Sequence, residues 1–303
     1  MTHESHTISN EVRPNLIKRP SALKKWWRLL IRSKTGTVGL IIVVTAIIIA
    51  LLAPVLAPHN PAAINPANML TPPVWMENGT TEHILGTDNL GRDILSRILY
   101  GSQVSLIVGV SSVVLAGIIG VTVGLIAGYF GGFIDSALMR LVDAFLAIPT
   151  ILFALVILAV FEPSVFTLII VLGITNWVAY ARLVRSEALS IKERDFVRAA
   201  HSIGVSNFKI ITRHLLPNVI SSFIVISTLS VATTIILEAS LSFLGLGVQP
   251  PTVSWGSILS DGRDYLATSW WLATFPGIAI TVTVLGIIFL GDWLRDVLDP
   301  KSK

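Results

Sequence analysis

The stretch Arg198–Pro217, RAAHSIGVSNFKIITRHLLP, is a charged, amphipathic segment between two long apolar segments. Each neighbour is long enough to cross a bilayer, which takes roughly 20 apolar residues. A hydrophobic protein that keeps such a segment in water is expected to present it to a soluble partner. The stretch therefore indicates a membrane protein with one large polar loop, residues 184–218.

The composition agrees with a membrane protein. Of the 303 residues, 53% are hydrophobic and 13% are charged, whereas soluble domains carry roughly 25% charged residues. The mean hydropathy is +0.76. Cysteine is absent, which excludes disulfides, thiolate metal sites and cysteine nucleophiles.

Six segments are expected to be membrane-spanning helices, because they are long and apolar and because the backbone inside lipid must satisfy its own hydrogen bonds. The first lacks a small-residue cleavage site and is expected to be retained. Pro149 is expected to kink the third, since proline removes a hydrogen bond from the helix. The chain is thus predicted to be an all-α integral membrane protein. The six segments are Thr37–Ala53, Val104–Ala127, Ala137–Phe161, Val165–Leu183, Val219–Leu241 and Leu272–Leu290.

The lysines and arginines predict the orientation. With the N-terminus inside, only Arg92, Arg97 and Arg263 of the 22 basic residues fall in outer segments. Because cytoplasmic segments are rich in lysine and arginine, both termini and the 184–218 loop are expected in the cytoplasm. Three parts follow: a cytoplasmic tail (1–36) with a basic, tryptophan-containing interfacial helix, the first span with an extracytoplasmic loop (37–103), and a core of five spans (104–303).

The outer loop, about 54–103, has two parts. Six prolines between residues 54 and 73 make the first part extended, because proline fixes φ and lacks an N–H donor. In the second part, HILGTDNLGRDILSRILYGSQVSL (83–106), we expect Thr87 or Asp88 to cap an amphipathic helix on the outer membrane surface, with its charged side facing water. Catalysis by Asp88 and Asp93 is disfavoured, because no histidine or third acid accompanies them.

Small and acidic residues within the spans give two further expectations. Glycines recur every fourth residue from Gly120 to Gly128 on one side of the second span, which predicts close helix packing. Asp143 and Glu238 lie near or inside spans. A direct role in transport stays open for each, as do pairing with Arg140 for the first and contact with water for the second.

The sequence contains no motif for energy conversion. It lacks a G-x-x-x-x-G-K-[ST] phosphate loop, a metal-ligand cluster, a nucleophile–base arrangement and a histidine within a span. The chain is therefore expected neither to hydrolyse ATP nor to bind a metal or cofactor. Active transport would draw its energy from another subunit, through the 184–218 loop.

The loop itself is predicted to be a helical elbow. A helix from Glu187 to about Ser202 ends at Gly204, which adopts the left-handed conformation. A second short helix, Val205–Thr212, follows, and Pro217 breaks the chain before the fifth span. A basic helix resting on anionic lipid would carry the same charges, so this alternative stays beside docking to a protein.

The loop resembles the cytoplasmic EAA loop of ABC importer permeases: two alanines, a glycine four residues later and a Leu-Pro pair twelve residues further on, with Arg198 in place of the family's first glutamate. The segments LGTDNLGRD (85–93), RLVDAFLAIPT (140–150) and EASLSFLGLGVQPPTVSWGSIL (238–259) resemble the dipeptide/oligopeptide-type permeases in particular. The resemblance implies that an ATPase is contacted by Arg198, Ala199, Ala200, Gly204, Val205, Ser206, Asn207, Phe208, Lys209, Leu216 and Pro217.

The resemblance also implies the type I permease fold and the second of two related permease subunits in a peptide importer of the inner membrane. It implies a sister permease, two cytoplasmic ATPases that bind ATP and Mg²⁺, and an extracytoplasmic binding protein, with no cofactor or catalysis in this chain. Di- or oligopeptides, glutathione or a nickel complex all fit as substrates. A stand-alone carrier, and a membrane scaffold or channel with a docking loop, stay open as other classes.

A polar stripe runs along the fifth span at steps of three or four residues, on one side of an apolar helix. It either lines a water-filled path where two permeases meet or forms hydrogen bonds between helices of this chain. Both interpretations stay open. The members of the stripe are Ser227, Ser230, Thr234, Glu238 and Ser242.

Overall fold

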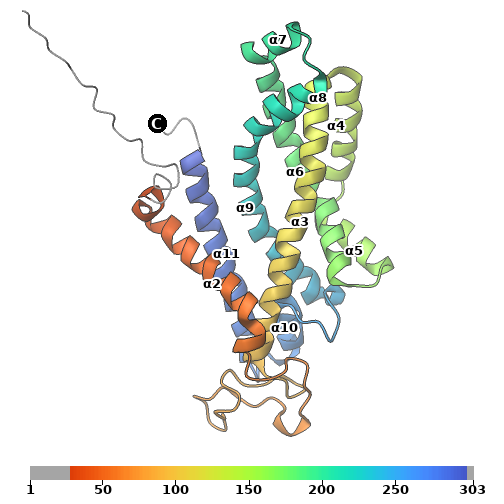
Figure 1. The fold of residues 1–303 in the computed structure, drawn as a ribbon. Coiled ribbons are helices and arrows are strands. Elements are labelled where there is room, and N and C mark those ends of the chain that lie inside the picture. Colours follow the sequence, from red (N-terminus) through yellow and green to blue (C-terminus); the bar gives the residue numbers. More distant parts are fainter. Residues whose placement is uncertain (1–27, 299–303) are drawn as a thin grey trace, which may run out of the picture.

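The structure is a computed structural model that describes residues 28–298 as helices joined by turns and loops (Figure 1). The long helices are α2 (Lys34–Leu56), α3 (Ile94–Phe130), α6 (Val165–Lys192), α9 (Leu216–Leu241) and α11 (Trp271–Leu298). The shorter ones are α4 (Gly132–Leu146), α5 (Thr150–Val160), α7 (Asp195–Ser202), α8 (Asn207–Ile210) and α10 (Trp255–Gly262). Single 3-10 turns lie at Pro66–Asn68 and Arg263–Tyr265, and π turns lie at Ile211–Leu215 and Ser242–Leu246.

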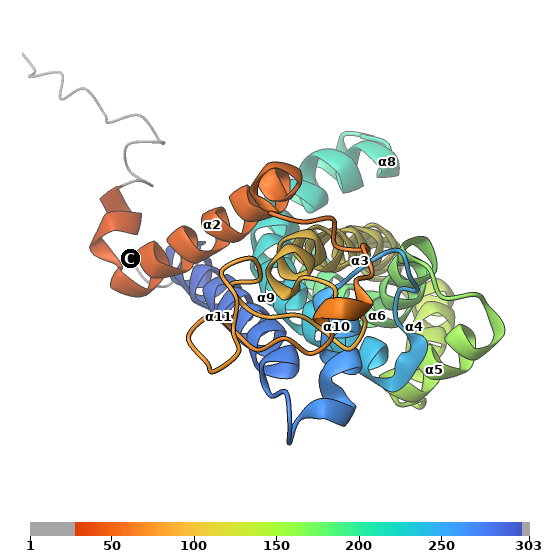
Figure 2. The same ribbon diagram turned by 90° about the horizontal axis from the view of Figure 1, so that it is seen from below.

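Helix α3 is the centre of the bundle. It packs along α6 and α9, with α2 and α11 against each other on one side and α4 and α5 on the other (Figures 1 and 2). The loop 57–93 and α10 cover one end, whereas α7 and α8 project from the other end, toward which the start of α2 and the end of α11 also point (Figure 1). The tryptophans of the expected interfacial helix fall outside the described residues, although 28–32 is helical.

The glycines of α3 bring this helix close to α6. A Cβ atom at Gly120 would lie 2.5 Å from the carbonyl oxygen of Trp177, and one at Gly128 would lie 2.6 Å from the Cβ atom of Ala188. Side-chain atoms do not approach so closely, so the two backbones can be neighbours only because these positions are glycine. The close packing predicted from the four-residue spacing is confirmed.

Within residues 28–298, five helices are long and apolar enough to cross a membrane, and α4 with α5 forms a sixth candidate that is bent by 82°. We expected a kinked but continuous third span, yet the helix stops at Leu146 and restarts at Thr150. Pro149 accounts for the break, because it lacks an N–H and disfavours helical backbone at Ile148. The predicted set of six segments is thus found as five spans and one broken pair.

The prediction that Pro217 breaks the chain is wrong. Residues 207–246 form one helical run, in which Ile211–Leu215 is a π turn. A π turn widens the backbone just before the proline, so the ring avoids the carbonyl group of Arg213, four residues earlier. The polar loop is therefore joined to α9 by continuous helix rather than by a hinge.

The predicted surface helix of the outer loop is also wrong. Residues 83–93 form turns closed by a bridge between Thr87 and Asp93, and α3 begins at Ile94 with Asp93 as its cap. The side chains expected to face water, those of Arg92, Asp93 and Arg97, are at most 8% exposed. Buried charges need partners, and these residues find theirs far along the chain, as described below.

Candidate functional site

The polar loop forms an elbow of α7 and α8 at one end of the bundle (Figure 1). Its first helix is not the predicted one from Glu187, because α6 runs on to Lys192 and the chain breaks before α7. After α7, Gly204 has a φ of +78°, the left-handed conformation that ends helices. The turn at Gly204 is therefore as predicted, and the elbow begins later than predicted.

The inner face of the elbow is apolar and packs on α3 and α6. Val197, Ala200 and Ile210 are buried there in one cluster with side chains of both helices. The hydroxyl of Tyr129, at the end of α3, donates a hydrogen bond of 2.8 Å to the Asn207 side chain at the start of α8. These contacts hold the elbow on the bundle without any partner.

The outer face of the elbow carries two large apolar side chains. Ile203 is 81% exposed and Phe208 is 76% exposed, one on each side of Gly204 along the chain. Large apolar groups exposed together at a tip mark a contact surface. Val205 was predicted to contact the partner, but it is half-buried in the elbow's own cluster, and its N–H donates to the carbonyl group of Ala200 at 3.1 Å.

Basic side chains surround this apolar tip. Arg194, Arg198, Lys209 and Arg213 are exposed, and Arg198 pairs with Glu193 at 3.7 Å. A basic rim around an apolar tip suits an acidic protein surface as well as anionic lipid, so both interpretations of the loop stay open on these side chains alone. Of the other predicted contact residues, Ala199, Ser206, Asn207 and Pro217 are exposed and Leu216 is half-buried.

The polar stripe of α9 turns into the subunit at its outer end. Thr234, Glu238 and Ser242 are at most 3% exposed, whereas Ser227 and Ser230 are half-buried. The suggested contact of Glu238 with water is therefore wrong. The path assignment stays a prediction for the two serines at the inner end.

Glu238 is held by hydroxyl groups of the same chain. Its Oε1 atom accepts hydrogen bonds from Ser242 and Ser254 at 2.8 Å each, and its Oε2 atom accepts one from Ser105 at 3.3 Å. The bonds join α9 to α3 and to the cap of α10. They support the second interpretation of the stripe, hydrogen bonding within the subunit, for its outer end.

Two ion pairs join α4 to α6. Asp143 binds Arg182 at 2.6 Å, and Asp135 binds Arg185 at 2.5 Å. Pairing of Asp143 with Arg140, one of the alternatives left open, is not found, because the neighbouring helix supplies Arg182 instead. The Asp143 pair is more than half exposed on both sides, so it contributes little to stability in water.

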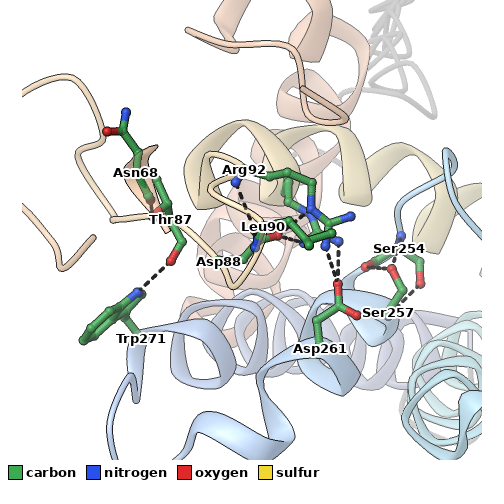
Figure 3. Close-up of polar contacts among 10 residues, drawn as sticks. Asn68, Thr87, Asp88, Leu90, Arg92, Ser254, Ser257, Asp261 and Trp271 are labelled. Carbon is green, nitrogen blue, oxygen red and sulfur yellow. Dashed lines mark hydrogen bonds and ion pairs between the residues drawn. The ribbon is translucent and has the colours of Figure 1, made fainter. Parts of the chain in front are cut away.

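A network of charges fastens the outer loop to α10 at the opposite end (Figure 3). Asp88 pairs with Arg92 at 2.6 Å and with Arg97, and Asp261 of α10 pairs with the same arginines at 3.0 and 2.8 Å. In addition, the indole N–H of Trp271 donates to the carbonyl group of Thr87 at 3.1 Å (Figure 3). The charges of the two acids and the two arginines cancel, so the network is suited to holding the outer loop against α10 rather than to binding an ion.

Two histidines lie beside Asp93, contrary to the expectation that none accompanies the acids. The Nδ1 atom of His83 is 3.0 Å from the Oδ1 atom of Asp93, and that of His59 is 3.8 Å from it. The three residues come from different parts of the loop, and their spacing in the sequence does not match a known metal-ligand motif. Only the fold brings them together.

Comparison with known proteins agrees with this architecture. Residues 120–303 match the family model described as binding-protein-dependent transport system inner membrane component, and residues 21–73 match that of the N-terminal TM domain of oligopeptide transport permease C. The chain therefore belongs to the family of inner membrane components of binding-protein-dependent transport systems, and it is a multi-pass membrane protein.

Individual relatives match almost the whole chain. It is 41% identical over 290 residues to the di/tripeptide transport system permease protein DppC of Pseudomonas aeruginosa, covering 96% of this chain and 95% of that protein. It is 44% identical over 281 residues to the dipeptide transport system permease protein DppC of Escherichia coli K12, with coverages of 93% and 94%. It is 43% identical over 286 residues to the dipeptide transport system permease protein DppC of Alkalihalophilus pseudofirmus, covering 93% of this chain and 92% of that protein.

Proposed function

We propose that this chain is one of two permease subunits of an ATP-driven importer that carries short peptides across the inner membrane. Relatives named for dipeptide or di/tripeptide transport match it over nearly their full lengths, which supports the substrate class. The chain forms half of the path and catalyses no reaction. A sister permease, two cytoplasmic ATPases that bind ATP and Mg²⁺, and an extracytoplasmic binding protein complete the importer, which adopts the type I fold.

The orientation in this proposal has both termini and the elbow in the cytoplasm. The start of α2 and the end of α11 point toward the same end of the bundle as α7 and α8 (Figure 1). The arginines at the other end, Arg92, Arg97 and Arg263, are the exceptions to an otherwise cytoplasmic set of basic residues. The acids Asp88, Asp261 and Asp264 pair with these arginines.

The observation that carries the proposal is the exposed apolar tip on a firmly packed elbow. Ile203 and Phe208 offer apolar area to a soluble protein, while Val197 and Ala200 anchor the elbow to the bundle. Because the elbow continues into α9 as helix, a movement of a docked ATPase is transmitted to a membrane span. This connection is what coupling between ATP hydrolysis and transport requires.

Peptide uptake by cells that lack the chain tests the proposal. Labelled di- and tripeptides should enter poorly after deletion, and the wild-type chain and the Ile203→Val variant should restore uptake. Ile203→Asp should insert normally but fail to restore uptake, because burying its charge in an apolar contact costs free energy. Uptake that persists after deletion, with loss of glutathione or nickel uptake instead, would show the substrate class to be wrong.

Restoration of peptide uptake by Ile203→Asp would have a different meaning. It would leave the substrate class intact and show that the elbow tip is not the docking surface. Membrane levels of each variant, measured on immunoblots, separate both results from a failure of insertion.

A further inference from the structure

One oxygen of Asp93, Oδ1, faces two imidazole rings and is hydrogen-bonded to the nearer one, that of His83. Its Oδ2 atom caps α3 by accepting a hydrogen bond of 2.8 Å from the Ser96 N–H, which leaves Oδ1 facing His83 at 3.0 Å and His59 at 3.8 Å. The three facing atoms all lie within 4.8 Å of one another. Zn²⁺ binds nitrogen and oxygen at about 2.0–2.2 Å, so tetrahedral ligand atoms lie about 3.4 Å apart. The observed separations from Asp93 fall on either side of this value.

His83 is positioned from its far side. Its Nε2 atom lies 3.3 Å from the Nδ2 atom of the Asn68 amide group. A half-turn of that amide presents its oxygen to Nε2–H, and the lone pair of Nδ1 then points at Asp93. An outer hydrogen bond of this kind fixes the tautomer of metal-binding histidines. The ring is 4% exposed, so it has little freedom to turn away.

His59 has an unused ring nitrogen next to the same carboxylate. Its Nδ1 atom is shielded from solvent and makes no hydrogen bond to any described residue. The backbone N–H of His59 donates to the Ser96 hydroxyl at 3.0 Å, which holds the residue beside the start of α3. A buried ring nitrogen without a partner is unfavourable, and a cation between the rings and Asp93 would give it one.

We propose that His59, His83 and Asp93 bind a divalent cation of the Zn²⁺ class, with water as a further ligand. Two imidazole nitrogens and one carboxylate oxygen suit Zn²⁺, whereas Ca²⁺ and Mg²⁺ prefer oxygen ligands alone. A groove lined by Pro58, Asn60, Tyr100 and Pro251 opens beside His59 and gives ions and water access. The bound ion ties the proline-rich segment after α2 to the middle of the loop and to α3, and so fastens the extracytoplasmic end of the bundle.

A single introduced thiol tests the site sharply, because the chain has no cysteine. His59→Cys replaces one ligand by another that Zn²⁺ accepts. In the assembled transporter, stripped with a chelator, Zn²⁺ at about ten times its Kd should slow maleimide labelling of this variant about tenfold, because only the metal-free thiol reacts. Mg²⁺ should not. Thr80→Cys, at an exposed position of the same outer loop, is the control and should label equally with and without Zn²⁺.

The remaining ligands decide whether protection comes from the site. Adding His83→Ala to His59→Cys should abolish the protection by Zn²⁺. Should that double variant fail to insert, Asp93→Asn serves instead, because asparagine still caps a helix but removes the charge. Equal labelling of His59→Cys with and without Zn²⁺, or protection that survives loss of the second ligand, would overturn the proposal.

Direct metal binding gives a second readout. After chelation and dialysis against Zn²⁺, the wild-type transporter should retain one more equivalent of zinc per chain than the His59→Ala transporter, with partner subunits identical in both. Thr80→Ala, at an exposed position of the same outer loop, should retain as much zinc as the wild type. Equal zinc contents of the wild type and His59→Ala would contradict a site at these residues.

Discussion

Phe208→Ala is expected to weaken binding of the ATPase to the permease pair. The side chain is 76% exposed, and full burial of a phenylalanine contributes about 1.5–3 kcal/mol. Docking can therefore bury about three quarters of it, for about 1.1–2.3 kcal/mol, which corresponds to a roughly 6- to 50-fold loss of affinity. Binding of purified ATPase to permeases in nanodiscs, followed by interferometry at fixed ionic strength, measures this loss.

Phe166→Ala is the matched control for this experiment. Phe166 is 71% exposed, and it lies in the first turn of α6, at the opposite end of that helix from the elbow. The same residue type with nearly the same exposure should leave ATPase affinity unchanged. If both variants bind the ATPase as tightly as the wild type, or if both weaken it equally, the reasoning about the elbow tip is refuted.

Three further substitutions, two of them with a control substitution, test the packing through the free energy of unfolding of the purified permease. Gly120→Ala places a methyl group 2.5 Å from a carbonyl oxygen and should cost about 1–3 kcal/mol. Gly277→Ala adds a methyl group that meets no other described segment within 4 Å and should be neutral or stabilising. Asp261→Ala removes one partner from two buried arginines and should cost about 1–3 kcal/mol, since the acid is partly exposed. Asp264→Ala, at a 74% exposed side chain, should cost under about 1 kcal/mol, and equal losses in this pair would argue against the network. Glu238→Ala removes the acceptor of three hydroxyl groups and should cost about 3 kcal/mol; a loss below about 1 kcal/mol would contradict these bonds.

The features that could be predicted from the sequence are those with a local cause. Apolar length predicted five candidate spans and the position of the broken pair α4 and α5, and the four-residue spacing from Gly120 to Gly128 predicted the contact between α3 and α6. Gly204 marked the turn of the elbow because few other residues adopt a positive φ. Each of these signals lies within a few turns of one helix.

The features that were missed depend on contacts between distant segments. From the sequence, Arg92 and Arg97 were predicted to be on the water-facing side of a surface helix. In the fold, α10 places Asp261 beside both of them. The histidines at Asp93 are a similar case, because His59 is separated from it by most of the outer loop. The spacing of residues within one segment contains no information about contacts of this kind.

The sequence also did not reveal which side chains of the elbow are exposed for contact with a partner. Val205 was predicted to contact the ATPase because it belongs to the loop motif, yet its side chain packs against the elbow's own buried cluster. Ile203 is outside the predicted contact set and is the more exposed residue. A motif locates the docking segment, whereas burial decides which of its residues are free for contact.

Disulfide crosslinking from the elbow tests the central claim most directly. The chain has no cysteine, so Lys209→Cys, at an exposed elbow position, and Thr80→Cys, at an exposed outer-loop position, each introduce one thiol. In membranes with the ATPase carrying a single surface cysteine near its permease contact, Lys209→Cys should crosslink to the ATPase, and Thr80→Cys should instead react with a reagent added outside. Absence of the crosslink in an ATPase-containing complex, or labelling of Lys209→Cys from outside, would contradict the assignment of the elbow as the cytoplasmic docking surface.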